Sequence, residues 1–265
     1  MAQGFFRFRG RWRTAGRALL GTLAVAFAVV SYTWLTLPDV RPLRRQNPTR
    51  TAFMDLRAAE ASAEGRTARV VQRWMSYRRI SPALVRAVIV AEDAAFWQHA
   101  GIDLDEIRAS MEINWAQGEL VRGASTITQQ LAKNLYLSPS RNPYRKVREL
   151  FIARRLEAEL PKARILEIYL NVIEWGDGIW GAEAAAQRHF GVPAASLLPD
   201  QAALLAGAII NPRRYSPSNP DARLRRRQQI ILGRMGEVVP PAPVPTLDVP
   251  IVPMVPPDIL KGSGS

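Results

Sequence analysis

Two adjacent carboxylates, Glu92 and Asp93, stand in the segment EDAAFWQHAG, residues 92–101, directly after an apolar run. An apolar helix is predicted to end here, and the partial negative charge of a helix C-terminus raises a carboxyl pKa. Two neighbouring aromatic side chains withhold water and act in the same direction. Glu92 is therefore a candidate general acid or base, the alternative being a solvated surface pair. His99 is interpreted as a hydrogen-bonded structural histidine rather than a ligand.

A strongly basic segment follows, in which ten cations outnumber three acids between Arg122 and Arg164. It contains the polar run GASTITQQ, residues 123–130, which opens a predicted helix whose free backbone N–H groups favour phosphate or sugar hydroxyls. Glu149 lies one turn after Arg145. We interpret the segment as a binding site for an anionic group; the alternative is a solvated basic helix face with an i,i+4 ion pair.

Composition narrows the function classes. The chain has 265 residues with 36 Lys and Arg against 23 Asp and Glu, so its net charge of +13 indicates nucleic acid, an anionic membrane or a phosphorylated substrate as partner. With 48% hydrophobic residues it can bury a large core, which excludes a wholly disordered or fibrous protein. The absence of cysteine excludes a disulfide scaffold, thiol catalysis and Cys-ligated zinc, and two histidines argue against a multi-histidine metal centre.

The N-terminal end of the chain predicts a membrane anchor. Residues 1–17 carry five arginines and no acid, and residues 18–37 contain 20 uncharged positions, which as a helix would span roughly 30 Å. The positive-inside tendency places residues 1–17 in the cytoplasm and the body of the chain outside it. The alternative is a cleavable signal peptide, although the apolar stretch is longer than a usual signal.

The body, residues 38–235, is predicted to be one mainly α domain. One helix is expected to start at Ser81-Pro82 and end at Glu92, and another to start at Asn142-Pro143 and stop at Pro161. Further helices are predicted over Ser125–Tyr136, Lys162–Ile173, Ala182–Phe190, Asp200–Ile210 and Asp221–Met235. Only residues 70–75 indicate a strand. The Pro-rich residues 236–265 predict an extended, poorly ordered tail.

Five segments follow one another along the body: EDAAFWQHAG (92–101), GASTITQQLAKN (123–134), RKVRE (145–149), KARILEIYLN (162–171) and RRQQII (226–231). Together they resemble the five motifs of the peptidoglycan glycosyltransferases, over about residues 50–235, with the fifth motif the loosest. This family occurs as a domain of class A penicillin-binding proteins and as monofunctional transglycosylases. No Ser-x-x-Lys occurs in the chain and nothing after Met235 resembles a transpeptidase domain, so the monofunctional type is expected.

The resemblance implies a lysozyme-like glycosyltransferase domain that polymerises lipid II into glycan strands. Glu92 would be the general base, removing the proton from the 4-hydroxyl of the acceptor, whose oxygen attacks the lipid-linked donor with inversion and releases undecaprenyl pyrophosphate. Glu149 would be the second essential glutamate, in the donor site. The implied cations near the diphosphate are Lys133, Arg141 and Arg145, and the implied polar ligands there are Ser125, Thr126, Gln130 and Asn134.

The resemblance also implies the partners and the place of action. The partners are lipid II, the growing glycan strand, the bacterial inner membrane and other cell-wall synthesis proteins, with the domain on the periplasmic side and no nucleic acid. No cofactor is required by the sequence. A divalent cation, Mg or Mn, stimulates some members of the family, but this chain offers no dedicated ligand cluster.

Two other functions stay open at this point. A lytic enzyme would also use one catalytic glutamate, but it has no use for the cations between Lys133 and Arg148. A basic protein that binds nucleic acid or anionic lipid would not need an apolar helix ending in a glutamate. The apolar residues from Ile102 to Trp115 are expected either to pack in the core or to dip into the membrane interface.

Overall fold

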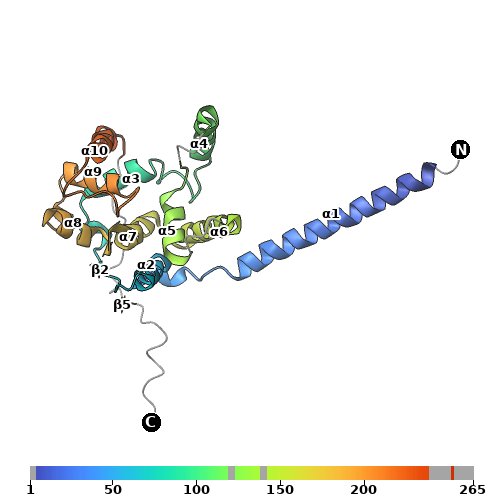
Figure 1. Cartoon of the computed structure of the whole chain (residues 1–265), viewed down its shortest axis with the longest axis horizontal. Helices are drawn as coiled ribbons and strands as arrows, with labels where there is room; N and C mark the ends of the chain where they lie inside the picture. Colours follow the sequence, from blue (N-terminus) through green and yellow to red (C-terminus); the bar gives the residue numbers. More distant parts are fainter. Residues whose placement is uncertain (1–3, 119–122, 138–141, 239–251, 254–265) are drawn as a thin grey trace, which may run out of the picture. The chain divides into compact units, whose positions relative to one another are not determined.

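The computed structural model describes residues 4–118, 123–137, 142–238 and 252–253. The chain divides into two compact units, Met1–Pro38 and Asp39–Ser265. The described part of the first unit is dominated by one helix, α1 (Gly4–Leu35), drawn in blue in Figure 1.

Helix α1 begins in the arginine-rich segment and ends at Leu35, two residues before the predicted end of the membrane helix. Several of its apolar side chains are exposed, among them Leu20 and Phe27. Within the described residues, no helix combines the length and the apolar character needed to cross a membrane. The spanning helix predicted for residues 18–37 is therefore not confirmed by the structure.

The second unit is mainly helical, as predicted. Its described α-helices are α2 (Ala52–Ala63), α3 (Pro82–Glu92), α4 (Leu104–Gln117), α5 (Ile127–Tyr136), α6 (Pro143–Glu159), α7 (Lys162–Val172), α8 (Ala182–Phe190), α9 (Pro199–Ala208) and α10 (Ala222–Arg234). Short 3-10 turns lie between them at η1 (Arg41–Arg44), η2 (Tyr77–Arg79), η3 (Ala194–Ser196) and η4 (Met235–Glu237).

The predicted helix starts are confirmed where the sequence supplies a capping side chain. The Ser81 hydroxyl accepts a hydrogen bond from the Ala83 N–H at 3.2 Å at the start of α3. The Asn142 side chain accepts from the Tyr144 N–H at 2.8 Å at the start of α6. At the other end, Gly191 closes α8 with a φ of +69°. These groups satisfy backbone donors and acceptors that a helix end leaves unpaired, which is why local sequence determines these boundaries.

Two helices were not predicted, α2 and α4. The side chains of Thr51 and Asp103 cap them, but neither helix carries a clean apolar stripe, so periodicity does not reveal them. The strand predicted over residues 70–75 is confirmed only as β2 (Val71–Gln72).

The strands are short. β2 pairs in parallel with β4 (Ile179–Trp180), which pairs antiparallel with β3 (Glu174–Gly176), in the order β2-β4-β3. Gly178 in the β3–β4 turn has a φ of +68°, and a Cβ there would lie 2.5 Å from the Arg69 carbonyl oxygen, so the turn requires glycine.

A second pair of strands involves the predicted tail. β1 (Gln46–Asn47) pairs in parallel with β5 (Val252–Pro253), a contact that a tail without strand periodicity does not predict. The other tail residues from 239 onward lie outside the described part of the chain.

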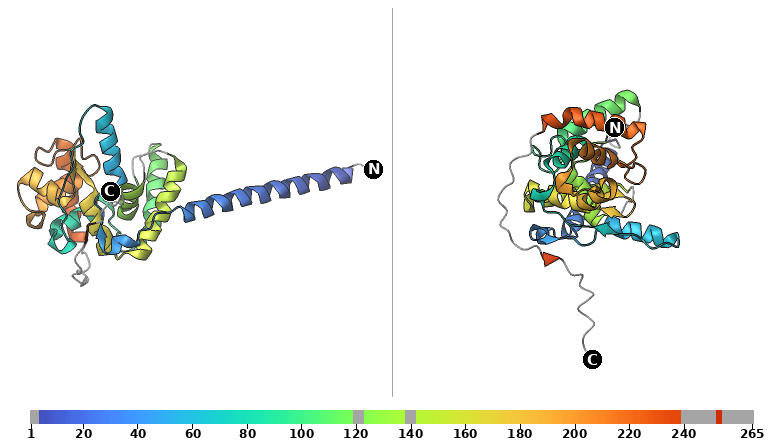
Figure 2. Two further views of the ribbon diagram at one scale, coloured as in Figure 1. Left: turned by 90° about the horizontal axis from the view of Figure 1, so that it is seen from below. Right: turned by 90° about the vertical axis from the view of Figure 1, so that its left-hand side faces the viewer.

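Two groups of helices enclose the core. α3 packs against α9 and α10, and α5 packs against α6, α7 and α2 (Figures 1 and 2). The largest fully buried side chains include Phe96, Tyr169, Trp175 and Trp180. α3 ends at Glu92, the first residue of the first motif, and α5 begins within the second motif; residues at both of these helix ends line one cleft.

Helix α4 stands apart from the other helices in Figure 1. Its side chains Leu104 and Met111 are exposed, and Trp115 is 91% exposed. Of the two arrangements expected for this apolar stretch, core packing is therefore wrong for these three side chains.

Candidate active site

Glu92 is the last residue of α3, and its side chain is 12% exposed. It lies on the wall of a cleft of about 630 Å³. The other lining residues include Asp93, Asp103, Glu106, Ser125, Thr126, Gln130, Ile210, Arg227 and Arg234. The first two motifs and the fifth motif region, far apart in sequence, therefore meet at this cleft.

One carboxylate oxygen of Glu92 accepts a hydrogen bond, and the other lies near a cation. The Gln130 amide donates from Nε2 to Oε2 of Glu92 at 2.9 Å. An Arg227 nitrogen lies 3.7 Å from Oε1, within reach of an ion pair but too far for a hydrogen bond. The Tyr169 hydroxyl donates in turn to Oε1 of Gln130 at 2.8 Å.

Burial raises the pKa of Glu92, which is the predicted direction. The Gln130 hydrogen bond and the charges of Arg227 and Lys133 oppose this rise without cancelling it, and Asp93 adds to it. A raised pKa makes the ionised carboxylate a stronger base than that of an ordinary glutamate. Glu92 is thus suited to take a proton from a group bound in the cleft.

Asp93 holds the end of the first motif against the start of α5. Its Oδ1 lies 2.9 Å from Nε2 of His99, and its Oδ2 accepts from the Ile127 N–H at 2.9 Å. Nδ1 of His99 accepts from the Gly101 N–H at 3.1 Å, so Nε2 carries the proton that Asp93 accepts. His99 is hydrogen-bonded as predicted, and the pair fixes the loop that follows Glu92.

Among the described residues, Asp93, His99 and Asp103 have side chains that could together ligate a divalent cation, but their existing contacts do not fit one. One ligand atom from each of Asp93, His99 and Asp103 lies within 4.8 Å of the others. However, both ring nitrogens of His99 and both oxygens of Asp93 already have protein partners. Oδ1 of Asp103 also accepts from a backbone N–H at the start of α4. A cation here would have to displace the contacts that shape the loop.

Glu149 lies in α6 with a side chain that is 4% exposed, between two cations. Arg145 contacts its Oε2 at 2.7 Å, and Lys146 contacts its Oε1 at 2.5 Å. Lys146 also reaches the Ser125 hydroxyl at 3.2 Å and the Gln129 side-chain oxygen at 3.3 Å. The i,i+4 pair predicted between Arg145 and Glu149 is present, but it is partly buried rather than solvated.

Lys133 connects the two glutamates electrostatically. Burial lowers the pKa of Lys133, the charges of Glu149 and Glu92 raise it, and those of Arg145 and Lys146 lower it. Its ammonium group is therefore close enough to feel both carboxylates and the cations of α6. A diphosphate bound near α6 would lie beside this cluster.

The remaining implied ligands differ in what they do. Thr126 is the N-cap of α5: its hydroxyl accepts from the Gln129 N–H at 3.2 Å and donates to the Gly101 carbonyl at 2.7 Å. The Asn134 amide donates to the Gln130 carbonyl at 2.8 Å, within the same helix. These two side chains are occupied by structural contacts, whereas Gln130 contacts Glu92 directly. Arg141 lies outside the described residues.

Two residues of the site were not singled out from sequence, Tyr169 and Arg227. Tyr169 belongs to the fourth motif and looks like an ordinary apolar-face residue. Arg227 gives a weak local signal, because it adjoins the buried stripe of α10, formed by Leu224, Gln228 and Ile231. An arginine beside a buried stripe usually has a partner, but the sequence does not say which one.

The fold and the site define a helical protein with a largely buried proton acceptor on the wall of a cleft and a group of cations around Glu149, one of which, Lys133, is coupled electrostatically to both glutamates. Residues 60–236 match the family described as Transglycosylase. The chain belongs to this family.

Named relatives are similar over most of the chain. It is 49% identical over 195 residues to a biosynthetic peptidoglycan transglycosylase of Laribacter hongkongensis, covering 74% of this chain and 86% of that protein. It is 47% identical over 231 residues to the protein of the same name from an Azoarcus species, covering 87% of this chain and 98% of that protein.

Proposed function

We propose that this chain, a peptidoglycan glycosyltransferase by family, polymerises lipid II with Glu92 as the general base. The observation that carries the proposal is the environment of Glu92: a carboxylate only 12% exposed, hydrogen-bonded to a neutral amide, on the wall of an open cleft. Similarity to the named transglycosylases supports the reaction class.

In the proposed step, Glu92 takes the proton from the 4-hydroxyl of the acceptor N-acetylglucosamine. The freed oxygen attacks C1 of the donor N-acetylmuramic acid from the face opposite the diphosphate. A new C1–oxygen bond forms as the C1–O–phosphate bond breaks, so the configuration at C1 inverts. The bonding electrons leave with undecaprenyl diphosphate, and the proton stays on Glu92 until solvent removes it.

The cations of the second and third motifs would stabilise the charge of the leaving group. Lys133, Arg145 and Lys146 gather around the buried Glu149. Positively charged donors already in place stabilise developing phosphate charge without reorganisation and without a protonated acid. Glu149 keeps two of these cations in position before the donor binds. We assign no step to a resident metal ion, because the Asp93, His99 and Asp103 group does not fit one.

We also propose that the chain works at the bacterial inner membrane, with α1 as its anchor and the second unit on the periplasmic side. Residues 18–37 contain no charge, residues 1–17 carry only positive charge, and the apolar side chains of α1 are exposed. The exposed Leu104, Met111 and Trp115 of α4 would dip into the membrane interface, where polyprenyl-linked substrates are found.

The test is incubation of the purified full-length chain with labelled lipid II in detergent. We expect glycan polymer and released undecaprenyl diphosphate from the wild type and neither product from Glu92→Gln. A parallel incubation with preformed glycan strands should leave them at their original length. Strand shortening without polymer formation would replace this function by a lytic one.

A further inference from the structure

We propose that Tyr169 is a positioning residue that orients the Gln130 amide toward Glu92. This inference rests on the proposed function and deepens it. The three side chains form one chain of hydrogen bonds: the Tyr169 hydroxyl to Oε1 of Gln130 at 2.8 Å, and Nε2 of Gln130 to Oε2 of Glu92 at 2.9 Å. The three side chains come from α7, α5 and α3, so this chain of hydrogen bonds joins three helices.

The Tyr169 side chain, including its polar hydroxyl, is fully buried. It is 0% exposed, and a buried hydroxyl without an acceptor is costly. Burial and the nearby charges of Glu92 and Asp93 raise the pKa of Tyr169 well above its ordinary value, so its hydroxyl stays protonated throughout the working range. The phenol therefore remains a hydrogen-bond donor whatever the state of Glu92.

A permanent donor on one side of the amide decides which way the amide faces. Gln130 has one acceptor oxygen and one donor NH₂ group. If Tyr169 donates to the oxygen, the NH₂ group faces Glu92 and stabilises its ionised form. In the flipped amide the oxygen would face Glu92, which then has to be protonated, and the Tyr169 hydroxyl would lose its acceptor. Tyr169 thus favours the orientation of the Gln130 amide that stabilises ionised Glu92.

The other charged groups around Glu92 do not depend on the hydrogen bonds between Tyr169, Gln130 and Glu92. Arg227 approaches from α10 at 3.7 Å, Lys133 from α5, and Asp93 is the next residue along the chain. A Tyr169→Phe substitution keeps the ring and changes none of these charges. A change in the pH dependence of catalysis would therefore report on the amide.

The experiment is the pH dependence of lipid II polymerisation by full-length Tyr169→Phe. We expect the acidic limb of kcat to move to higher pH by about one unit, since the net effect of one hydrogen bond corresponds to roughly a tenfold change in an equilibrium. Below the limb the variant should be about tenfold slower, and the ratio should shrink as the pH rises. KM for lipid II should stay unchanged, because Tyr169 does not line the cleft.

Two comparisons separate positioning from general damage to the fold. Tyr215→Phe removes a hydroxyl from another buried tyrosine, which packs against Leu224, and should leave the limb in place. In a Gln130→Met background, Tyr169→Phe should cause no further shift, since the amide through which it acts is gone. A rate loss that is equal at every pH, an unchanged profile, or a full extra shift in the Gln130→Met background would overturn the inference.

Failure of this inference differs from failure of the proposed function. If the wild type forms no polymer, the proposed function is wrong, and Tyr169 then has no general base to serve. If the wild type polymerises lipid II with an acidic limb that Tyr169→Phe leaves unmoved, only the role of Tyr169 is wrong.

Discussion

Glu92 and Glu174 are both largely withdrawn from solvent, and the pKa of each is raised, but their partners and surroundings differ. Burial raises the pKa of both. Glu174 lies in β3 with a side chain that is 2% exposed, and Arg57 of α2 donates to its Oε2 from Nε at 2.9 Å and from Nη2 at 2.8 Å. Glu92 has a neutral amide at hydrogen-bond distance and a cation only at 3.7 Å.

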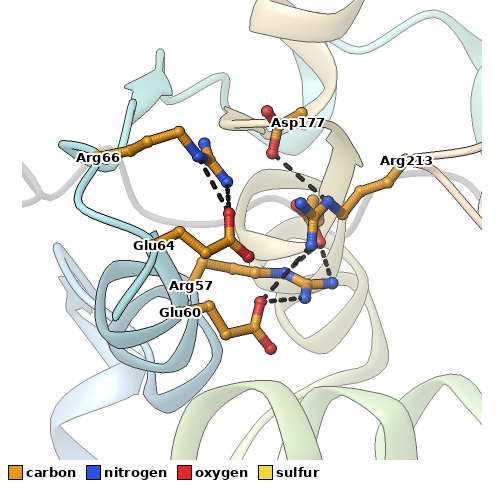
Figure 3. A network of polar contacts seen from close by, with 7 residues as sticks. Arg57, Glu60, Glu64, Arg66, Asp177 and Arg213 are labelled. Carbon is orange, nitrogen blue, oxygen red and sulfur yellow. Dashed lines mark hydrogen bonds and ion pairs between the residues drawn. The ribbon is translucent and has the colours of Figure 1, made fainter. Parts of the chain in front are cut away.

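Their surroundings differ as much as their partners. Arg57 also pairs with Glu60 at 2.7 Å, and Arg213 lies 3.5 Å from Glu60 and 3.4 Å from Asp177, so these residues form a network between α2, the β3–β4 hairpin and the segment after α9 (Figure 3). Glu92 instead borders an open cleft. A raised pKa alone therefore does not make a base: substrate access and a partner that leaves the proton site available are also needed.

The largest effect that we expect separates the two glutamates by activity. Glu92→Gln should reduce the rate of lipid II polymerisation about 10²–10⁴-fold, the usual contribution of a general base. Glu174→Gln should retain near-wild-type turnover. The measurement is the initial rate with both variants at saturating lipid II. Equal losses in both variants would remove the distinction between them.

Glu92→Gln should at the same time make the fold more stable. The folded-state pKa of Glu92 lies above the unfolded value, so the stability linked to this group is present at low pH and is lost as the pH rises through the folded pKa. Replacing Glu92 by a neutral amide removes that loss. Denaturant unfolding should show the variant more stable than the wild type at neutral pH, with the two converging in acid.

Removing the Arg57 side chain should test whether its ion pair with Glu174 stabilises the fold. Arg57→Met leaves Glu174 buried without its cation, which we expect to cost about 3 kcal/mol, the low end for a broken buried pair because the Arg57 side chain is 24% exposed. The loss should be smaller at acidic pH, where Glu174 is protonated. Unfolding in a Glu174→Gln background provides the control, since Arg57→Met should then cost less. An equal cost in both backgrounds would mean that the pair is not the source.

The next largest effect should come from the cations of the proposed donor site. Lys133→Ala and Arg145→Ala should each weaken donor binding by roughly 1.5–3 kcal/mol, the worth of a charge-assisted hydrogen bond. Arg223→Ala removes an equal charge from the exposed face of α10, outside the five motif segments, and should leave binding unchanged. Calorimetry with lipid II measures this difference. If all three variants bind alike, the cluster around Glu149 is only a basic surface.

The smallest effect concerns α1, the proposed anchor. Removal of residues 1–37 should leave a folded second unit, because that unit begins at Asp39 and its buried apolar side chains run from Val40 to Val238. Activity should fall more on lipid II in liposomes than on lipid II in detergent, since tethering raises the effective concentration at the membrane. A loss by the same factor in both media would show that α1 contributes to folding or catalysis instead.

Local sequence was enough to predict the helices whose ends carry their own signals. Ser81-Pro82 begins α3, and Gly191 closes α8. The helix predicted from Ser125 begins two residues later, because the Thr126 side chain caps it. The β3–β4 hairpin was missed because strands of two or three residues show no periodicity, although Gly178 supplied a turn signal.

The sequence identifies candidate residues of the site but not how they are arranged. Glu92 and Glu149 were singled out from motif and composition; the structure buries Glu149 between two cations and leaves Glu92 12% exposed, with a cation at 3.7 Å. The contact between Gln130 and Glu92 spans 38 positions, and that between Tyr169 and Gln130 spans 39. Such contacts depend on how α3, α5 and α7 pack, and no local pattern encodes that packing.

The central claim is that Glu92, and not another buried carboxyl, sets the protonation requirement of the reaction. The most direct test is kcat/KM for lipid II as a function of pH, measured for the wild type and for Glu174→Gln. We predict one acidic limb in each, with the same midpoint, lying above the ordinary glutamate value of about 4.3 because burial raises the pKa of Glu92. A midpoint at or below that value, or a limb that moves in Glu174→Gln, would contradict the account.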